Sequence, residues 1–427
     1  MENTETLTFV QEPDWSWIKK WLFRFIGTYL VLFIFPFPIS YIPGVDTAYE
    51  SLLNKLVNWV GHNVLHIQGD IASAMTGSGD RTYDYVLMLI LFVLALLISM
   101  VWTVLDRRSA HYRKHYHWLM VYVRYYLGMI LISYGFAKVI KTQFPYPGFV
   151  QLLKPLGDAS PMGLAWTFMG YSPLFNLFTG LGEVIGGFLL FFRRTTTIGA
   201  FLLISVLATV VMMNFSYDIP VKLYSTHLLL MSVFLLTPDF KRLYHFFISN
   251  KQAEPAVYTP HFTDRRWNMA RWVVKILFIA YVLISNVNSG LQRSKQYGDL
   301  ASRPPLYGAY LVTNFVLNGD TLPPLMTDDR RWKHLLVDRR EGFAFIQFMS
   351  GKYGRYNFAT DTSARTISMN FQNSAITNNL TYTTRDTGYL HIQGILEKDT
   401  VDIDLKKKGF LLVDRGFHWI NERPYNR

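Results

Sequence analysis

Two neighbouring stretches, WLMVYVRYYLGMILISYGFAKVI (118–140) and PLFNLFTGLGEVIGGFLLFF (173–192), decide the fold. Each is close to the ~20 residues that a helix needs to cross ~30 Å of hydrocarbon. Lys138 lies near the end of the first stretch, and Glu183 lies in the middle of the second. An ammonium and a carboxylate inside apolar helices are costly, so each needs a partner, water or a function. The two stretches predict the first half of a four-helix membrane core over residues 119–238.

The composition is that of a chain only partly surrounded by water. Half of its residues are hydrophobic and 17% are charged, against roughly 25% charged in soluble domains. It has no cysteine, which excludes disulfides, thiolate catalysis and Cys-based metal sites. The net charge is +12, but the basic residues cluster beside apolar segments. We interpret them as topology signals and contacts with anionic membrane lipids, not as a nucleic-acid site.

Seven apolar segments predict a polytopic α-helical membrane protein of about seven spans. They cover about 17–39, 85–105, 118–140, 173–192, 198–214, 221–236 and 272–287. The sixth is short and is predicted to be tilted or shielded by its neighbours. Residues 47–67 repeat apolar side chains at helical spacing and predict an amphipathic helix at the interface. The proline-rich stretch 141–172 holds two short apolar pieces, predicted to cap the bundle or dip into it.

The loops differ in their content of Lys and Arg. These residues are frequent in segments 1–24, 105–118, 193–194 and 241–271, and scarce in 37–85, 139–172 and 215–222. The positive-inside rule then predicts an inner-membrane protein with a cytoplasmic N-terminus and, after seven spans, a periplasmic C-terminal domain. The first apolar run is not followed by a small-residue cleavage site, so we expect it to remain as a span. If 221–236 does not cross, the C-terminal domain changes sides.

From about residue 300 apolar residues alternate with period two. Turn residues divide this part into eight expected strands, a spacing that predicts an antiparallel β domain. The expected strands are HLLVD, FAFIQFMS, YGRYNFA, TISMNF, NLTYTT, YLHIQGI, TVDIDL and FLLVDRGFHWI. Eight strands can close a small barrel, with a β-sandwich as the alternative. The aromatic residues of the tail 416–427 are expected to plug or clamp one end of it.

The predicted organisation therefore has four parts. They are a two-span region with the amphipathic periplasmic helix (1–118), the four-helix core (119–238), a cytoplasmic loop with the seventh span (239–290), and the β domain (291–427).

The core resembles the DoxX-like family of small membrane proteins. The residues that carry the resemblance are Arg124, Gly135-x-x-Lys138, Glu183-x-x-Gly186-Gly187 and the turn Arg193-Arg194, with paired fifth and sixth helices after them. The whole arrangement, with its extra spans and β domain, is similar to longer DoxX-like proteins of Bacteroidetes-type bacteria. The resemblance implies a compact four-helix unit, sometimes linked to quinone-coupled oxidation of sulfur compounds or to envelope redox stress. This chain has no cysteine, which argues against a thiol-based role.

Several polar residues of the core are predicted to meet in one outward-facing cavity. They are Lys138, Glu183, Tyr134, Asn214, His227 and Arg124, with Asp218 at the rim beside Lys222. In one hypothesis Glu183 and Lys138 pair there and hold a polar headgroup or exchange protons with a quinone. In the other they form a structural ion pair that fixes helix packing. His227 has apolar neighbours and is expected to be a hydrogen-bonded core histidine.

Two further motifs have simpler interpretations. His62 and His66 are four residues apart and would share a helix face, with Asp70 one turn on. They are weak metal-site candidates, and an interfacial surface pair is the default. The segment Thr76-Gly-Ser-Gly-Asp80-Arg81 lacks the ending of a phosphate-binding loop. We expect it to be a turn that caps the second span through Asp80 or Thr82.

These observations favour an accessory or scaffolding membrane protein with a lipid- or quinone-binding polar cavity. The first alternative is a subunit of a quinone-linked membrane oxidoreductase in which Glu183 handles protons. The second is an envelope assembly module that docks a partner protein through the β domain. The expected partners are membrane lipids and an envelope protein, a quinone is the one cofactor considered, and no nucleic acid is expected.

Overall fold

The computed structural model describes residues 14–69, 71, 76–253, 255, 264–339, 342–371, 378–385 and 388–426. The chain forms two compact units. The first comprises Met1–Gly135 and Gly182–Val282, and the second comprises Phe136–Leu181 and Leu283–Arg427.

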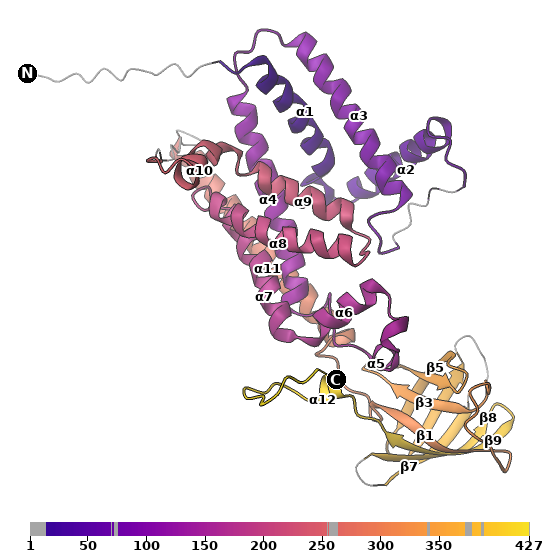
Figure 1. Cartoon of the computed structure of the whole chain (residues 1–427). Coiled ribbons are helices and arrows are strands. Elements are labelled where there is room, and N and C mark those ends of the chain that lie inside the picture. Colours follow the sequence, from indigo (N-terminus) through magenta and orange to yellow (C-terminus); the bar gives the residue numbers. More distant parts are fainter. Residues whose placement is uncertain are drawn as a thin grey trace, which may run out of the picture. The chain divides into compact units, whose positions relative to one another are not determined.

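Helices make up the first unit, and most of them are long and apolar (Figure 1). They are α1 (Trp17–Ile34), α2 (Val45–Asn63), α3 (Thr82–Leu105), α4 (Arg113–Val139), α7 (Pro173–Leu190), α8 (Thr196–Ser216), α9 (Lys222–Phe234), α10 (Phe240–Phe247) and α11 (Arg265–Tyr297), and the unit boundary falls within α4, α7 and α11. Seven helical segments among the described residues are long and apolar enough to cross a membrane. The predicted polytopic α-helical membrane protein is confirmed.

The sixth candidate span is shorter than a full crossing, as the sequence predicted. α9 has 13 residues, about 20 Å of helix against ~30 Å of hydrocarbon. The segment reaches 26 residues only when the short helix η3 (Thr237–Asp239) and α10 are included, as Lys222–Phe247. The loop predicted at the start of 239–290 therefore contains a helix of its own, α10.

A buried arginine ties α1 to α3 and to the start of α4. Arg24 is 3% exposed. Its guanidinium donates to the Tyr112 hydroxyl at 3.0 Å, to Thr103 Oγ1 at 3.0 Å and to the Asp106 carbonyl oxygen at 2.7 Å. Tyr112 in turn donates to Asp106 Oδ2 at 2.8 Å. Since a buried charge is tolerated only when it is hydrogen-bonded, this network specifies how α1 packs on α3.

The predicted four-helix core consists of α4, α7, α8 and α9. Gly186 and Gly187 on α7 face different neighbours: a Cβ on Gly187 would lie 2.8 Å from the Gly128 carbonyl oxygen of α4, whereas one on Gly186 would lie 2.5 Å from Leu203 Cδ2 of α8. Small residues let helix backbones approach closely in membranes, where packing rather than hydrophobicity drives association. The Gly-Gly pair after Glu183 therefore lets α7 pack closely against two helices.

The amphipathic helix predicted over 47–67 is α2, and it ends at Asn63. The capping prediction for the next turn was wrong. The Asp80 carboxylate accepts the backbone N–H groups of Lys222 and Leu223 at 2.8 and 2.9 Å, so it caps α9. The helix α3 is capped by its own Asp84, whose carboxylate accepts the Arg81 N–H at 2.9 Å. A carboxylate stabilises any helix N-terminus that it reaches, and sequence proximity alone did not identify the right one.

The second unit contains α5 (Phe149–Leu153), η2 (Leu156–Asp158), α6 (Pro161–Tyr171) and a β-barrel. The two short apolar pieces predicted in 141–172 are α5 and α6. The strands are β1 (Gly308–Leu317), β2 (Asp320–Thr321), β3 (Trp332–Val337), β4 (Gly342–Phe348), β5 (Tyr353–Asp361), β6 (Thr366–Phe371), β7 (Asn378–Arg385), β8 (Tyr389–Leu396) and β9 (Asp399–Lys407).

The strands form an antiparallel meander that closes on itself (Figure 1). Each strand pairs with the next, and β9 returns to pair with β1 in the register Phe315↔Ile403 and Tyr310↔Lys407. The two-residue β2 only extends one edge of β1, so eight strands close the barrel. Buried apolar side chains such as Phe315, Trp332 and Ile346 fill its interior, as expected for an eight-stranded barrel. The predicted eight-stranded antiparallel barrel is confirmed.

The identity of two strands was predicted wrongly. Seven of the expected strands are β3 to β9, but the first barrel strand, β1, was missed between the proline pairs Pro304-Pro305 and Pro323-Pro324. The last expected strand, FLLVDRGFHWI, is instead the short helix α12 (Leu411–Asp414) followed by an irregular tail. Phe417 and Trp419 of this tail are 79% and 91% exposed, so they do not plug the barrel. Since β1 and β9 already pair, no open edge remains for another strand.

Residues before the barrel cover part of its outer wall. Phe149 of α5 packs with Ala309 and Leu336 of the barrel in one buried cluster, and its N–H donates to Asp338 Oδ2 at 3.1 Å.

Beyond the end of α11, Asp299 joins several segments. Its carboxylate lies 2.7 Å from Lys141 Nζ and 2.9 Å from a guanidinium nitrogen of Arg339, and it accepts the Tyr146 N–H at 3.0 Å. Lys141 also donates to the Gly170 carbonyl oxygen of α6 at 2.8 Å.

Candidate functional site

The two charged residues predicted inside the apolar helices, Lys138 and Glu183, are both buried, and they belong to different units. Lys138 is 6% exposed in the second unit, and Glu183 is 2% exposed in the first. Glu183 lies one turn before Gly187 on α7, close to the packed face that meets α4. Their burial agrees with both hypotheses made for them, a functional pocket and a structural role, and their pairing stays a prediction.

The predicted core histidine is confirmed. His227 is 5% exposed on α9. Its Nε2 lies 2.6 Å from the Tyr29 hydroxyl of α1, its Nδ1 lies 2.7 Å from the Leu223 carbonyl oxygen, and its ring stacks on Phe33 at 4.3 Å between centroids. Both ring nitrogens therefore have partners within the bundle. The ring is held between α1 and α9 and serves packing in this structure.

The other predicted cavity residues lie near α9 but have separate partners. Asn214, 3% exposed, donates to Ser225 Oγ at 2.9 Å. Asp218 is exposed and pairs with Lys222 at 2.9 Å, while Tyr134 on α4 is 40% exposed. Asp218 and Lys222 thus meet as expected at the turn between α8 and α9. These contacts tie α8 to α9.

The weak metal candidates do not share a helix face. His62 lies in the last turn of α2 with both ring nitrogens near carbonyl oxygens, of Asn58 at 2.7 Å and of Gly69 at 3.1 Å. His66 lies beyond the end of α2 in a left-handed backbone conformation, with φ of 52°, so the helical four-residue spacing does not apply to it. Asp70 lies outside the described residues. In the part of the chain that the structure describes, no three His, Asp or Glu side chains gather as a metal site would require.

Arg124 does not join the other predicted cavity residues. It lines a separate cavity of about 1010 Å³, which is formed by α4, the end of α7 and α11. We call it the basic aromatic pocket. It is lined by Phe37, Pro38, Trp118, Val121, Tyr122, Arg124, Tyr125, Phe191, Phe192, Arg193, Arg194, Trp267, Ala270, Arg271, Trp272, Val274, Lys275 and Phe278. All of these residues belong to the first unit.

The apolar side of this pocket is a set of packed rings. Tyr125 of α4, Phe191 at the end of α7 and Phe278 of α11 meet pairwise, with ring centroids 5.4 to 5.6 Å apart. Aromatic pairs at such distances hold one another rigidly. They give the pocket a preformed apolar wall, the usual character of a binding site for an organic ligand.

The charged side of the pocket carries a single sign. Five of its lining residues are Arg or Lys, and none of its described lining residues is acidic. Arg124 is 6% exposed and is oriented by its Nε, which donates to the Leu190 carbonyl oxygen at 2.8 Å. Lys275 Nζ lies 4.1 Å from the Phe192 ring centroid and 4.8 Å from that of Trp272. The rings stabilise this ammonium within the apolar wall through cation–π contact.

Such an arrangement can bind an anion that carries an apolar body. Guanidinium groups match phosphate and carboxylate oxygens in a bidentate geometry, and the rings can cover the hydrocarbon part. Sequence reasoning named Arg124 and the Arg193-Arg194 turn but not Lys275. A signal was present, since Lys275 is a cation inside the predicted seventh span. The convergence of five cations from α4, α11 and the turn after α7 is a feature of the fold alone.

Comparison with known proteins gives one informative similarity. No family model matches the chain, and no solved structure matches it. A stretch of 118 residues, 27% of this chain, is 35% identical to the uncharacterized protein YwoB of Bacillus subtilis (strain 168) and covers 73% of that protein. The chain belongs to the family of YwoB.

Proposed function

We propose that this chain is an accessory membrane protein that binds an anionic amphiphile, with its charged headgroup held in the basic aromatic pocket. The observation that carries the proposal is the lining of that pocket. It combines five cations with a wall of aromatic rings, and none of the described lining residues is acidic. A phospholipid with a net negative headgroup matches both halves of this lining. The headgroup would meet the guanidinium groups, and the acyl chains would leave along the apolar helices.

The charge of the pocket favours an anionic lipid over a quinone. A quinone headgroup is neutral and needs one or two hydrogen-bond donors, not several cations. The quinone-linked role expected from the DoxX-like resemblance would instead depend on Glu183. This residue lies on α7 one turn before Gly187 and is not among the residues that line the pocket. Binding of a lipid headgroup therefore has the stronger support of the two functions.

We further propose that the protein lies in the cytoplasmic membrane with its N-terminus inside and its barrel in the periplasm. The support is the distribution of Lys and Arg between the loops. In this orientation Arg193, Arg194 and Arg271 lie at the cytoplasmic interface, where anionic lipid headgroups attract basic residues. The pocket would then recruit its ligand from the inner leaflet.

The proposal is tested by purifying the full chain in mild detergent and identifying the copurified lipids by mass spectrometry. Binding is then measured by native mass spectrometry after reconstitution in phosphatidylcholine nanodiscs with and without phosphatidylglycerol. We expect phosphatidylglycerol to be retained in preference to phosphatidylcholine. Equal retention of the two lipids would contradict the proposal. A retained quinone with turnover would replace it by the oxidoreductase alternative.

Two pocket variants and one control locate the binding. Neutralising one cation near an anionic membrane surface costs about 1 kcal/mol, roughly a fivefold loss of affinity. We expect this loss for Lys275→Gln and for Arg271→Gln, and a larger one for the double variant. Lys55→Gln is the control, because Lys55 is an exposed lysine on the amphipathic helix α2. If the control loses as much lipid as the pocket variants, binding is general and the pocket is not the site.

The docking alternative is distinguished in the same preparation. If the chain is an envelope assembly module, a protein partner should copurify with the full chain and be lost when residues 300–427 are deleted. Retention of phosphatidylglycerol by the deleted form, with no protein partner at either length, would support the lipid-binding function.

A further inference from the structure

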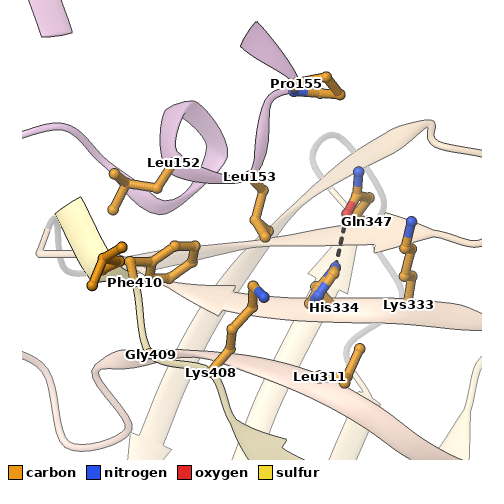
Figure 2. Close-up of a pocket in the computed structure, with 11 residues that line it drawn as sticks. Leu152, Leu153, Pro155, Leu311, Lys333, His334, Gln347, Lys408, Gly409 and Phe410 are labelled. Carbon is orange, nitrogen blue, oxygen red and sulfur yellow. Dashed lines mark hydrogen bonds between the residues drawn. The ribbon is translucent and has the colours of Figure 1, made fainter. Parts of the chain in front are cut away.

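A second pocket lies in the other unit, between α5 and the outer wall of the barrel. Its volume is about 650 Å³, and all of its lining residues belong to the second unit. Residues Leu311, His334 and Gln347 form a row across β1, β3 and β4, since Leu311 pairs with His334 and His334 with Gln347 in the strand register. Figure 2 shows this row on the barrel strands, with Leu153 of α5 pointing toward the strands and Leu152 on the side of Phe410.

The polar part of this barrel-wall pocket is basic. Lys333 of β3 and Lys408, which follows β9, flank His334 in Figure 2. The remaining lining residues are Leu152, Leu153, Pro155, Leu311, Gln347, Gly409, Phe410 and Leu411, and no acidic residue occurs among the described lining. The pocket therefore offers two ammonium groups and one imidazole beside an apolar wall.

His334 is built into the pocket in a defined tautomer. It is 5% exposed, and its Nδ1 lies 2.8 Å from Gln347 Oε1. Because a carboxamide oxygen only accepts, the neutral ring carries its proton on Nδ1 and a lone pair on Nε2. Among the described residues, Nε2 has no hydrogen-bond partner. The second nitrogen of this nearly buried ring is thus left for something that enters the pocket.

We propose that this pocket binds an oxyanion carried on an apolar body, and that His334 takes up a proton at Nε2 when the anion enters. The anion oxygens would contact the two lysines and the new Nε2–H, while the apolar body would lie against Leu152, Leu153 and Phe410. The proton comes from solvent, and no bond other than N–H forms. The site is independent of the lipid proposal, since it lies in the other unit.

The electrostatics of the empty pocket agree with this coupling. Burial lowers the pKa of His334, and Lys333 and Lys408 lower it further, against the opposing effect of the Gln347 hydrogen bond. Among the described residues, the other lining groups are not titratable, since α5, β1 and β4 contribute Leu152, Leu153, Leu311 and Gln347 and the segment after Lys408 contributes residues 409–411. The ring is therefore neutral near neutral pH when the pocket is empty. A bound anion reverses the sign of the local field and raises the pKa of His334.

Isothermal titration of the full chain in detergent, with hexanoate as the probe, tests the proposal. Titration in buffers of different ionisation enthalpy counts the protons taken up on binding. We expect uptake of up to one proton near neutral pH, and an affinity that falls by up to tenfold per pH unit as the pH rises. Hexanamide, which has the same body without the charge, should show no proton uptake. Binding of hexanoate without proton uptake, or independent of pH, would overturn the proposal.

Matched variants assign the effect to the pocket. His334→Gln should remove proton uptake and pH dependence while leaving weakened binding by the lysines. Lys408→Gln should keep the uptake and weaken binding about tenfold, as expected for one charged hydrogen bond. Lys398→Gln, on an exposed barrel turn, is the control and should bind as the wild type does. Circular dichroism verifies that each variant is folded.

Two results would overturn the assignment in different ways. Equal effects of Lys398→Gln and Lys408→Gln would show that the anion does not occupy this pocket. Inorganic phosphate that binds as tightly as hexanoate would show that the apolar wall takes no part, which contradicts the proposed ligand class.

Discussion

Gly128 on α4 and Gly187 on α7 face each other in the membrane core. A Cβ on Gly187 would lie 2.8 Å from the Gly128 carbonyl oxygen, and a Cβ on Gly128 would lie 2.9 Å from the Gly187 carbonyl oxygen. At these distances any side chain forces the two helices apart. The pair therefore fixes the approach of α4 to α7, and with it the walls of the basic aromatic pocket, because Phe191 lies 2.8 Å from the position of a Gly128 Cβ.

Replacement of Gly187 by Ala should destabilise the bundle. Overpacking of a closely packed interface costs about 1 to 3 kcal/mol, so we expect a lower thermal unfolding midpoint in detergent. Gly128→Ala should have a similar effect and should also weaken phosphatidylglycerol retention, because it displaces Phe191. Gly157→Ala is the control, since a Cβ there would meet nothing within 4 Å. An unchanged midpoint for Gly187→Ala would show that the helices are not in this contact.

Replacement of Asp299 by Asn should loosen the second unit. Asp299 is the anionic partner of both Lys141 and Arg339, and burial already lowers the pKa of Lys141 against the stabilising contact with this carboxylate. Removing one member of a buried ion pair leaves an uncompensated charge and costs on the order of 3 kcal/mol. We expect faster proteolysis of the segment between α11 and β1, measured by timed trypsin digestion.

An exposed ion pair provides the control for Asp299. Asp329 and Lys352 lie 2.8 Å apart with side chains that are 55% and 72% exposed. Exposed pairs contribute about 0 to 1 kcal/mol, so Asp329→Asn should leave the digestion rate nearly unchanged. If both variants behave alike, the Asp299 contacts do not hold the unit together.

The contacts of Asp106 predict a pH dependence of stability. Hydrogen bonds from Ser109 and Tyr112 hold the pKa of Asp106 at about 2, below the ~3.9 of an unfolded aspartate. Its contribution is therefore complete above about pH 4 and is lost as the pH falls toward 2. Asp106→Asn should lower the unfolding midpoint at pH 6, and the difference from the wild type should shrink as the pH falls below 4.

A second variant separates the Asp106 effect from general acid sensitivity. Ser109→Ala removes the largest cause of the lowered pKa, so it should shift the loss of stability to higher pH without removing it. Asp320→Asn, at an exposed position on β2, should leave the pH profile unchanged. A constant difference between Asp106→Asn and the wild type from pH 6 to pH 3 would contradict the assignment.

The sequence predicted those features that depend on local pattern. The seven apolar segments and the strands β3 to β9 each carry their own periodicity, so each could be identified alone. The strand β1 carries a largely apolar run, GAYLVTNFVL, shortly after Pro304-Pro305, and a run of this kind does not distinguish strand from helix. The prediction of a last strand, FLLVDRGFHWI, was wrong for the opposite reason. Its aromatic pattern is that of a strand, but the β1–β9 pairing leaves it no partner.

Features that depend on which segments meet could not be predicted in the same way. Asp80 caps a helix that begins 142 residues later, and the barrel-wall pocket joins α5 to strands more than 150 residues further on. The individual residues of the basic aromatic pocket were visible as topology signals. These residues line one cavity only because α4 packs against α11. A single sequence contains no direct signal for that packing.

A double-mutant cycle on Tyr29 and His227 tests how the outer helix α1 is attached to α9. Tyr29→Phe removes the hydroxyl 2.6 Å from His227 Nε2 and leaves a buried polar atom unpaired, which costs about 1 to 3 kcal/mol. His227→Leu removes both the unpaired atom and the ring that stacks on Phe33.

After His227→Leu, the further change Tyr29→Phe should therefore cost much less than it does in the wild type. The expected coupling is about 0.5 to 3 kcal/mol, obtained from unfolding midpoints in detergent. Tyr85→Phe is the matched control, because Tyr85 is 51% exposed on α3 and should change the stability by less than about 0.5 kcal/mol. Strictly additive effects of Tyr29→Phe and His227→Leu would mean that the hydrogen bond does not hold α1 on the core, and that the aromatic stack alone positions the histidine.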